Sequence, residues 1–266
     1  MLLQHLIFVF LAGLLTALAT GVGAVPFFLV EDIGDRWNVL LWGLASGIMV
    51  SASLFGLLRE GLNYGTQWLI VPGLVAGVVL VVVGHHIIDH SKLDPRHYAE
   101  ADFRKLVLIL GVLTVHSFPE GVAVGVAFAE LGLATGDAVS ILGVTVPVLG
   151  LFMTIAISIH NIPEGIAISI PLEAMGVSNP RKVWWAVFSS LPQPIGAVIA
   201  FTFVSVATAF LPFGFGFAAG AMIYLVLTEF IPEAREAGAD LPAGGIRELV
   251  IGLGIGVLVM VPLAFV

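Results

Sequence analysis

Long apolar runs, separated by short polar segments, extend along this chain from end to end. A helix that crosses a bilayer needs about 20 mostly apolar residues, and eight runs reach that length. We place them, to within a few residues, at 4–30, 38–58, 68–90, 104–131, 138–174, 181–211, 213–232 and 245–266. None of them alternates apolar and polar positions as the strands of a membrane barrel do. The pattern therefore predicts eight helices, with tilts or kinks in the two longest runs.

Composition supports a membrane protein. Of the 266 residues, 59% are hydrophobic and 11% are charged, whereas a soluble domain carries about a quarter charged residues. We therefore predict an all-α membrane protein in which residues 1–266 form a single bundle of eight transmembrane helices. The absence of cysteine excludes disulfides and thiolate metal sites. A net charge of -8, without a run of basic residues, argues against a nucleic-acid partner.

The distribution of lysine and arginine predicts the orientation. If the N-terminus lies outside the cytoplasm, nine of the ten basic residues fall in inner segments and only Arg59 falls in an outer one. Both termini are then extracytoplasmic, and a cytoplasmic loop at about 91–103 joins the third and fourth helices. We expect this multi-pass protein in the plasma (inner) membrane. The outer loops carry Glu60, Glu130 and Asp137, which would raise the local concentration of cations.

Two neighbouring runs contain near-copies of one polar motif, His-Ser-Phe-Pro-Glu-Gly and His-Asn-Ile-Pro-Glu-Gly. Each pairs a histidine with a glutamate four residues later, His116 with Glu120 and His160 with Glu164, so each pair shares a helix face. Ionisable groups inside a span are costly and point to function. If the two faces meet, two imidazoles and two carboxylates converge as ligands for a metal such as Zn²⁺. The alternative is a pair of structural His–Glu contacts between kinked helices.

These motifs resemble the signatures of the fourth and fifth helices of the ZIP (Zrt-, Irt-like protein) family, particularly its prokaryotic branch. The stretch 43–49, which ends in Met49, is similar to the family's second helix, and the stretches 220–224 and 229–233 are similar to its seventh. The resemblance covers nearly the whole chain. It implies an eight-helix fold with both ends outside, and transport of divalent metals.

The resemblance also implies a set of metal ligands. The primary transport site corresponds to His116, Glu120, His160, Asn161 and Glu164, with Met49 at its edge. A second metal, where the family holds one, would be bound by Ser117, Asn161, Glu164 and Gln193. Here the chain departs from the family, which commonly has Asn at the position of Ser117 and Glu at that of Gln193. Charge counting then predicts one tightly bound divalent metal, because Glu120 and Glu164 together neutralise one such ion.

Further candidate ligands lie toward the predicted cytoplasmic side. His86 and His90 lie at the inner end of the third run, with the loop residue His97 beyond it, and they could share a helix face that binds a departing metal; the alternative is a solvated loop with incidental histidines. Glu229, paired with Glu233, is a candidate exit ligand at the end of the seventh run. The alternative there is a helix-end carboxylate in interfacial water.

Taken together, these features predict a carrier that moves divalent transition-metal cations into the cytoplasm through a midplane His/Glu site. Zinc is the first candidate, and iron, manganese, cobalt and cadmium remain open. The partners are the cation, the lipid bilayer and, as one option, a second copy in a homodimer; no prosthetic group is expected. One alternative is a proton-coupled carrier of another solute that uses Glu120 and Glu164. Another is an intramembrane metalloenzyme, which the absence of a His-Glu-x-x-His motif disfavours, so we predict that the chain is not an enzyme.

Overall fold

The computed structural model describes residues 2–30, 33–90, 116–131, 138–141 and 143–261, without the side chains of residues 88–90, 171 and 174. Within these ranges, seven helices are long and apolar enough to cross a membrane: Leu2–Phe28, Asp35–Gly61, Gln67–Ile87, Val148–Ile170, Asn179–Val206, Thr208–Ala237 and Pro242–Val259. All seven coincide with predicted runs, which confirms the all-α membrane class. The fourth run appears as a helical stretch at 116–127, and its beginning and the loop 91–103 lie outside the described residues. The count of eight and the orientation of the termini stay predictions.

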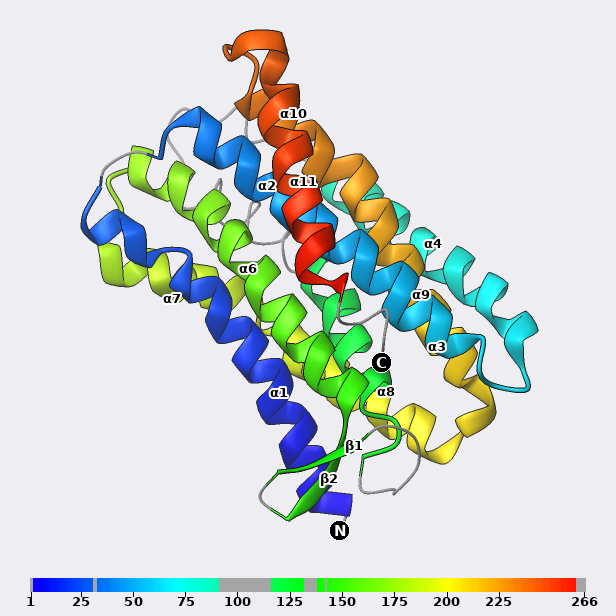
Figure 1. Ribbon diagram of the computed structural model, residues 1–266. Helices are drawn as coiled ribbons and strands as arrows, with labels where there is room; N and C mark the ends of the chain where they lie inside the picture. The colour runs from blue at the N-terminus through cyan, green and yellow to red at the C-terminus, as the bar shows by residue number, and fades with distance from the viewer. Residues whose placement is uncertain (1, 31–32, 91–115, 132–137, 142, 262–266) are drawn as a thin grey trace.

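One group of helices packs around the N-terminal helix. It consists of α1 (Leu2–Val22), the 3-10 turn η1 (Val25–Phe28), the stretch 116–127, α6 (Val148–Ala174), α7 (Asn179–Ser189) and α8 (Pro192–Val206). Helix α1 contacts α6, α7 and α8 (Figure 1). Glycine permits the closest approaches: a Cβ on Gly165 would collide with the carbonyl oxygen of Thr20, and one on Gly121 with that of Gln193.

The second group consists of two tightly packed helix pairs, α2 with α11 and α4 with α9. Its elements are α2 (Asp35–Ser51), the π turn η2 (Ala52–Leu58), α3 (Arg59–Gly61), η3 (Gln67–Leu69), α4 (Ile70–His90), η5 (Thr208–Phe210), α9 (Leu211–Leu225), the π turn η6 (Val226–Phe230), α10 (Ile231–Ala237), η7 (Pro242–Gly245) and α11 (Ile246–Val259). A Cβ on Gly47 would meet the carbonyl oxygen of Leu253, and one on Gly77 that of Phe217. Close approach of the two backbones therefore stabilises each helix pair. Helix α2 also contacts α6, which joins the two groups.

The predicted run 138–174 is not helical throughout. Its first part forms an antiparallel hairpin of β1 (Ala138–Ile141) and β2 (Val144–Pro147), and α6 begins only at Val148. Alternate β-branched residues favour strands here. Gly143, with φ of +79°, provides the reversed turn. The prediction of a helix over this part was wrong, because hydropathy alone does not separate a short apolar strand from a helix.

The predicted run 181–211 contains a break, as its length suggested. Helix α7 ends at Ser189 and α8 begins at Pro192, which has no N–H to continue the ladder. The hydroxyl groups of Thr20 on α1 and Ser190 in the bend lie 2.8 Å apart. The sixth span ends at Val206 rather than at 211, because the backbone leaves the helical region at Ala207, with φ of -125° and ψ of 62°. Pro212 lies in the first turn of α9, where proline is tolerated. The boundary predicted near residue 212 was therefore several residues late.

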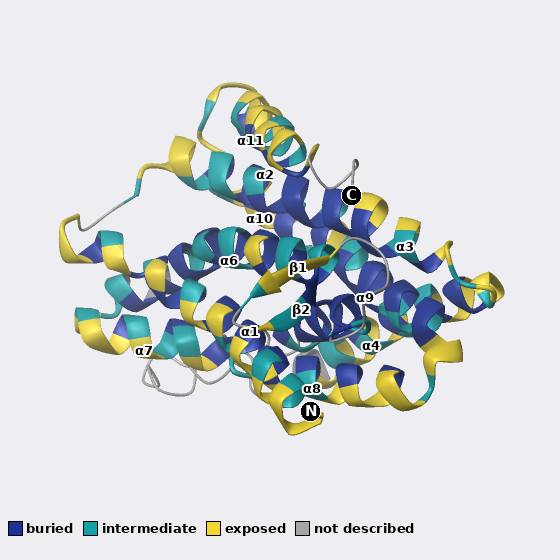
Figure 2. Cartoon of the chain, turned by 60° about the horizontal axis from the view of Figure 1, so that its bottom comes forward, coloured by how far each residue is buried: buried dark blue, intermediate teal, exposed yellow. Residues whose placement is uncertain are grey.

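Burial follows the inverted pattern of a membrane bundle. Large apolar side chains such as Leu11, Leu15 and Val75 are exposed at the periphery, where lipid would cover them. Figure 2 shows the buried residues concentrated where the helices face one another. Glutamate, histidine, asparagine and glutamine are found among those buried residues. The fold therefore carries a polar centre within an apolar exterior.

Candidate metal site

Three ionisable side chains meet in the interior of the first helix group. Glu120, His160 and Glu164 each offer a ligand atom, and these atoms lie within 4.8 Å of one another. Their exposed fractions are 0%, 0% and 1%. His160 Nε2 lies 2.9 Å from Glu120 Oε1. We call these three residues the central cluster; it contains three of the four ionisable residues of the paired motifs.

The two helices that carry the central cluster place it by simple geometry. His160 and Glu164 are one turn apart on α6, so both project from the same face. Glu120 comes from the stretch 116–127, whose Gly121 allows it to lie against the backbone of α8 at Gln193. Pro163 donates no backbone hydrogen bond, so the carbonyl of Ile159, next to His160 on α6, lacks its usual helical partner. These positions follow directly from the repeated motif.

Glu164 lacks the partners that a buried carboxylate requires. Among the described residues, neither of its oxygens has a hydrogen-bond partner, and the same holds for Asn161 Oδ1 and His160 Nδ1. An unpaired buried charge is strongly destabilising, so such groups are normally paired or coordinate metals. The unpartnered atoms are carboxylate or amide oxygens and an imidazole nitrogen. Each can offer a lone pair to a metal, and such atoms are the usual ligands of a divalent cation. The cluster thus fits a cation bound between Glu120, His160 and Glu164.

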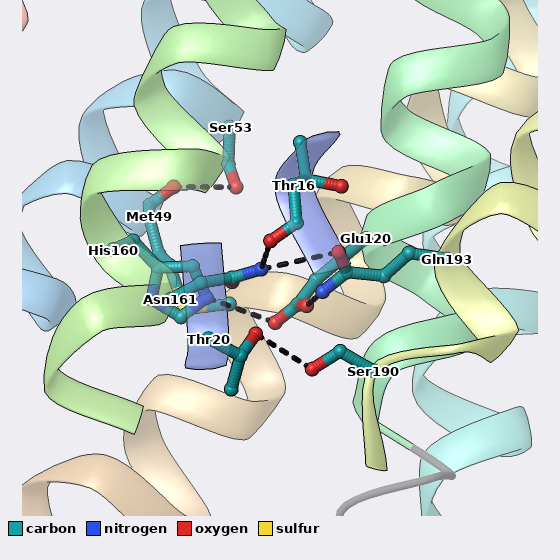
Figure 3. Close-up of polar contacts among 9 residues, drawn as sticks. All are labelled: Thr16, Thr20, Met49, Ser53, Glu120, His160, Asn161, Ser190 and Gln193. Atoms are coloured by element: carbon teal, nitrogen blue, oxygen red, sulfur yellow. Dashed lines mark hydrogen bonds and ion pairs between the residues drawn. The ribbon is translucent and has the colours of Figure 1, made fainter. Parts of the chain in front are cut away.

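A chain of amides anchors one side of the cluster (Figure 3). Asn161 Nδ2 donates to the backbone oxygen of Thr16 at 2.7 Å and to Gln193 Oε1 at 3.1 Å. Gln193 Nε2 donates in turn to Glu120 Oε2 at 2.5 Å. One oxygen of Glu120 therefore accepts from an amide, while the other faces His160. Asn161 keeps only its Oδ1 for a metal, and Gln193 acts as a donor to Glu120.

The other two residues predicted at the site are buried nearby. Met49 is 1% exposed and lies on α2, which packs against α6; Figure 3 draws it together with Glu120 and His160. Its carbonyl oxygen accepts a hydrogen bond from Ser53 Oγ at 2.8 Å. Ser117 is fully buried next to His116. Both residues stay candidate ligands.

His116 belongs to a different cluster of ionisable side chains. It meets His85 of α4 and Glu229 of η6, and the ligand atoms of these three residues lie within 4.8 Å of one another. His85 Nε2 lies 2.9 Å from Glu229 Oε1 and 3.4 Å from His116 Nε2. His116 Nε2 lies 3.8 Å from Glu229 Oε2. We call these residues the second cluster.

The separation of His116 from the central cluster has a geometric cause. Residues four apart share a face but lie about 6 Å apart along the axis. Glu120 faces His160 on α6, so His116 lies one turn further along, where α4 and the π turn approach. The sequence motif indicates that His116 and Glu120 share a helix face. It does not indicate which residue of the neighbouring helices lies opposite each of them. The structure brings the two motifs together, but it divides their four ionisable residues between two clusters.

His85 was not among the residues predicted as ligands, although a signal for it exists. Gly73, Gly77 and Val81 are buried at four-residue intervals along α4, and His85 is the next position on that face. His86, one position later, is exposed. The side chain of His90 lies outside the described residues. Glu229 belongs to the second cluster, whereas Glu233 is exposed and belongs to neither cluster.

A cavity of about 220 Å³ lies at the other end of the same helices. It is lined in part by Glu60, Asn63, Tyr64 and Glu130. Tyr64 Oη donates to Glu130 Oε1 at 3.2 Å, and Asn63 Nδ2 donates to Glu60 Oε2 at 3.1 Å. Burial first, and then the charges of Glu130 and Glu60, raise the pKa of the Tyr64 phenol well above its usual range. Two of the acidic residues predicted in outer loops therefore share one cavity, which we call the Tyr64 cavity.

The fold and the two clusters define a multi-pass helical membrane protein with buried histidine–carboxylate groups suited to a divalent cation. Comparison with known proteins gives the family. The model of the family described as ZIP Zinc transporter matches residues 84–264. This match covers more than half of the chain, and the chain therefore belongs to the ZIP zinc transporter family.

Individual relatives agree with this assignment. The zinc transporter GufA of Myxococcus xanthus is 30% identical over 262 residues, which are 92% of this chain and 98% of that protein. The zinc transporter ZIPB of Bordetella bronchiseptica is 32% identical over 251 residues, 90% of this chain and 76% of that protein. A relative from Arabidopsis thaliana is 40% identical over 220 residues, but this chain spans only 33% of its length. These relatives are transporters rather than enzymes, in agreement with the prediction from sequence.

Proposed function

We propose that this protein carries divalent transition-metal cations across its membrane, zinc first among them, and that the central cluster is the transport site. The supporting observation is Glu164, a fully buried carboxylate without a hydrogen-bond partner among the described residues. Glu120 and Glu164 together provide two negative charges, which neutralise one divalent ion. Imidazole and carboxylate together favour a borderline metal over Mg²⁺ or Ca²⁺. The same ligands could also bind iron, manganese, cobalt or cadmium.

The proposed route connects three sites in order. Acidic residues of the Tyr64 cavity attract a hydrated cation, the central cluster binds it after it loses water, and the second cluster receives it. With the predicted orientation, the second cluster lies toward the cytoplasm, so transport would run inward. His85 and Glu229 are partly exposed, whereas the central cluster is buried. Rocking of one helix group against the other would move the cation between levels.

The second cluster suggests how the candidate exit ligand Glu229 acts in transport. Glu229 can replace the carboxylate ligands that a cation loses when it leaves the central cluster, with His85 and His116 as nitrogen ligands. His116 contributes one residue of the paired motifs to this step. His86 and Glu233, which are exposed, would act later, and His90 is a further candidate for this step. We further propose that the protein resides in the plasma (inner) membrane; a homodimer stays an untested option.

Uptake by reconstituted vesicles tests the proposal. The change Glu164→Gln keeps the size of the side chain but removes its charge, so zinc uptake should fall to background. Glu236→Gln, which removes an exposed carboxylate on α10, is the matched control and should transport normally. Folding is checked for both variants by size-exclusion chromatography and thermal melting in detergent. Normal zinc uptake by a well-folded Glu164→Gln variant would exclude the central cluster as the transport site.

The same vesicles test the alternative of a proton-coupled carrier for another solute. Two buried carboxylates, Glu120 and Glu164, are the observation that favours it. A panel of divalent metals is offered with and without a pH gradient, and the internal pH is recorded. The proposal expects metal uptake from the panel. Proton flux without uptake of any metal would favour the alternative.

A further inference from the structure

The π turn η6 contacts both clusters with two consecutive residues. Pro232, just beyond the turn, cannot donate to the carbonyl of Thr228, and the hydroxyl of Thr228 donates to the carbonyl oxygen of Tyr224 at 2.9 Å. Such wide turns inside α-helices occur frequently at functional sites. Here the turn ends in Glu229 and Phe230. Glu229 belongs to the second cluster, and Phe230 reaches the central one.

Phe230 stacks on the imidazole of His160. The ring centroids lie 5.5 Å apart at an interplanar angle of 26°. Phe230 also packs edge-to-face against Trp42 of α2, with ring centroids 4.9 Å apart and an interplanar angle of 61°. Phe230 is 3% exposed, so protein surrounds it almost completely. The ring is therefore held firmly against a proposed metal ligand.

The stacking of Phe230 restricts the orientation of the His160 imidazole, which has few other contacts. The only polar contact of His160 among the described residues is the 2.9 Å contact of Nε2 with Glu120, and Nδ1 has no partner. Metal-bound histidines usually have a second contact that fixes the direction of the ring. In this chain the ring of Phe230 packs on the face of the imidazole and restricts its rotation in place of such a hydrogen bond. Since His160 is in the first helix group and Phe230 in the second, the contact also crosses between the groups.

We propose that Phe230 is a positioning residue that holds His160 in its metal-binding orientation, and that η6 couples this orientation to the second cluster through Glu229. The proposal rests on the proposed function and deepens it. A cation that binds Glu229 acts on the residue next to Phe230, so occupancy of the second cluster alters the support of His160. Arrival of a cation at the second cluster then changes the affinity of the central cluster. A carrier needs this property because its substrate must leave the site that bound it.

The test measures binding of Co²⁺ to the purified full-length chain, by titration and by visible absorption, which reports the ligand geometry. Phe230→Leu keeps an apolar side chain but removes the ring, and it should weaken binding at the central cluster by about tenfold or more, with a changed spectrum. Phe230→Tyr retains the ring and should restore both affinity and spectrum. Phe201→Ala removes another buried ring, on α8, and is the control for loss of packing. If Phe230→Leu does not fold, Phe230→Met provides flexible bulk and replaces it.

Coupling is tested by a double-mutant cycle with Glu229→Gln. The effect of Phe230→Leu on Co²⁺ affinity should differ between the wild-type background and the Glu229→Gln background. Equal effects in both backgrounds would overturn the coupling. Wild-type affinity and spectrum in a folded Phe230→Leu variant would overturn the positioning role. Failure of the wild type to bind Co²⁺ at the central cluster would instead refute the proposed function itself.

Discussion

Replacing Gln193 by glutamate should change the number of metals that the protein binds near the central cluster. In the wild type, Gln193 Nε2 donates to Glu120 Oε2 at 2.5 Å, and Gln193 Oε1 accepts from Asn161 at 3.1 Å. A neutral amide therefore occupies the side of Glu120 that faces away from His160. A second cation on that side would find Ser117, Asn161 and Gln193 as ligands, all of them neutral. We predict one tightly bound divalent cation at this site in the wild type.

The magnitudes favour this stoichiometry. Two divalent cations about 4 Å apart repel each other by roughly 17 kcal/mol at an effective dielectric constant of about 20. Each neutral ligand returns only about 1–3 kcal/mol. In Gln193→Glu, the added carboxylate attracts a divalent cation at a bond distance of about 2 Å by roughly 17 kcal/mol at the same dielectric constant, which offsets this repulsion. The substitution should therefore create or strengthen a second site.

The assay is metal content per chain, measured by calorimetry and by elemental analysis. Both proteins carry Glu229→Gln and lack the loop histidines His86, His90 and His97, so that the second cluster and the loop do not add to the count. The expected values are one zinc ion in this background and two after Gln193→Glu at neutral pH. Two equally occupied zinc ions next to Glu120 in the parent protein would refute the charge argument.

Three further predictions concern the loop, the packing and the Tyr64 cavity. Changing His86, His90 and His97 to alanine should lower the rate of zinc uptake only partly, because the sequence predicts them near or in the cytoplasmic loop, away from the midplane; complete loss of uptake would make the loop essential. Gly77→Ala should lower the melting temperature in detergent, because its Cβ would collide with the carbonyl oxygen of Phe217, and overpacking costs about 1–3 kcal/mol. Gly254→Ala faces open space and is the control; equal melting temperatures would contradict the packing argument. The Tyr64 phenol should titrate later than an exposed tyrosine, since burial, Glu130 and Glu60 raise its pKa. The folded state then retains a proton that the unfolded state loses above about pH 10, so stability should fall with rising pH there; an ultraviolet titration that is identical for the wild type and Tyr64→Phe, apart from amplitude, would contradict this.

The sequence predicted the spans well because each needs only sustained hydropathy. It was less successful where local chemistry decides the structure. The strands β1 and β2 are as apolar as a helix would be, and their β-branched residues and Gly143 distinguish them only weakly. The gap between the predicted runs 181–211 and 213–232 falls on Pro212, although proline is equally compatible with the first turn of α9.

The candidate site was predictable to the level of helix faces. The four-residue spacing of His160 and Glu164 indicated their common face, and the repeated motif indicated Glu120 as their partner. The spacing does not give the relative height of two antiparallel helices, and so it did not place His116 beside Glu229. His85 and Phe230 come from the other helix group. The four-residue spacing along α4 indicates the face on which His85 lies, but the contacts of both residues with the clusters depend on tertiary packing.

The position of zinc in a crystal or cryo-EM structure of the zinc-loaded protein tests the central claim most directly. Anomalous scattering at the zinc edge would identify the ion in crystals. The account predicts an ion between Glu120, His160 and Glu164, with bonds of about 2.0–2.2 Å to nitrogen and oxygen ligands, and its loss in Glu164→Gln. Zinc bound elsewhere, with the central cluster free of metal under conditions in which the wild type transports, would contradict the account.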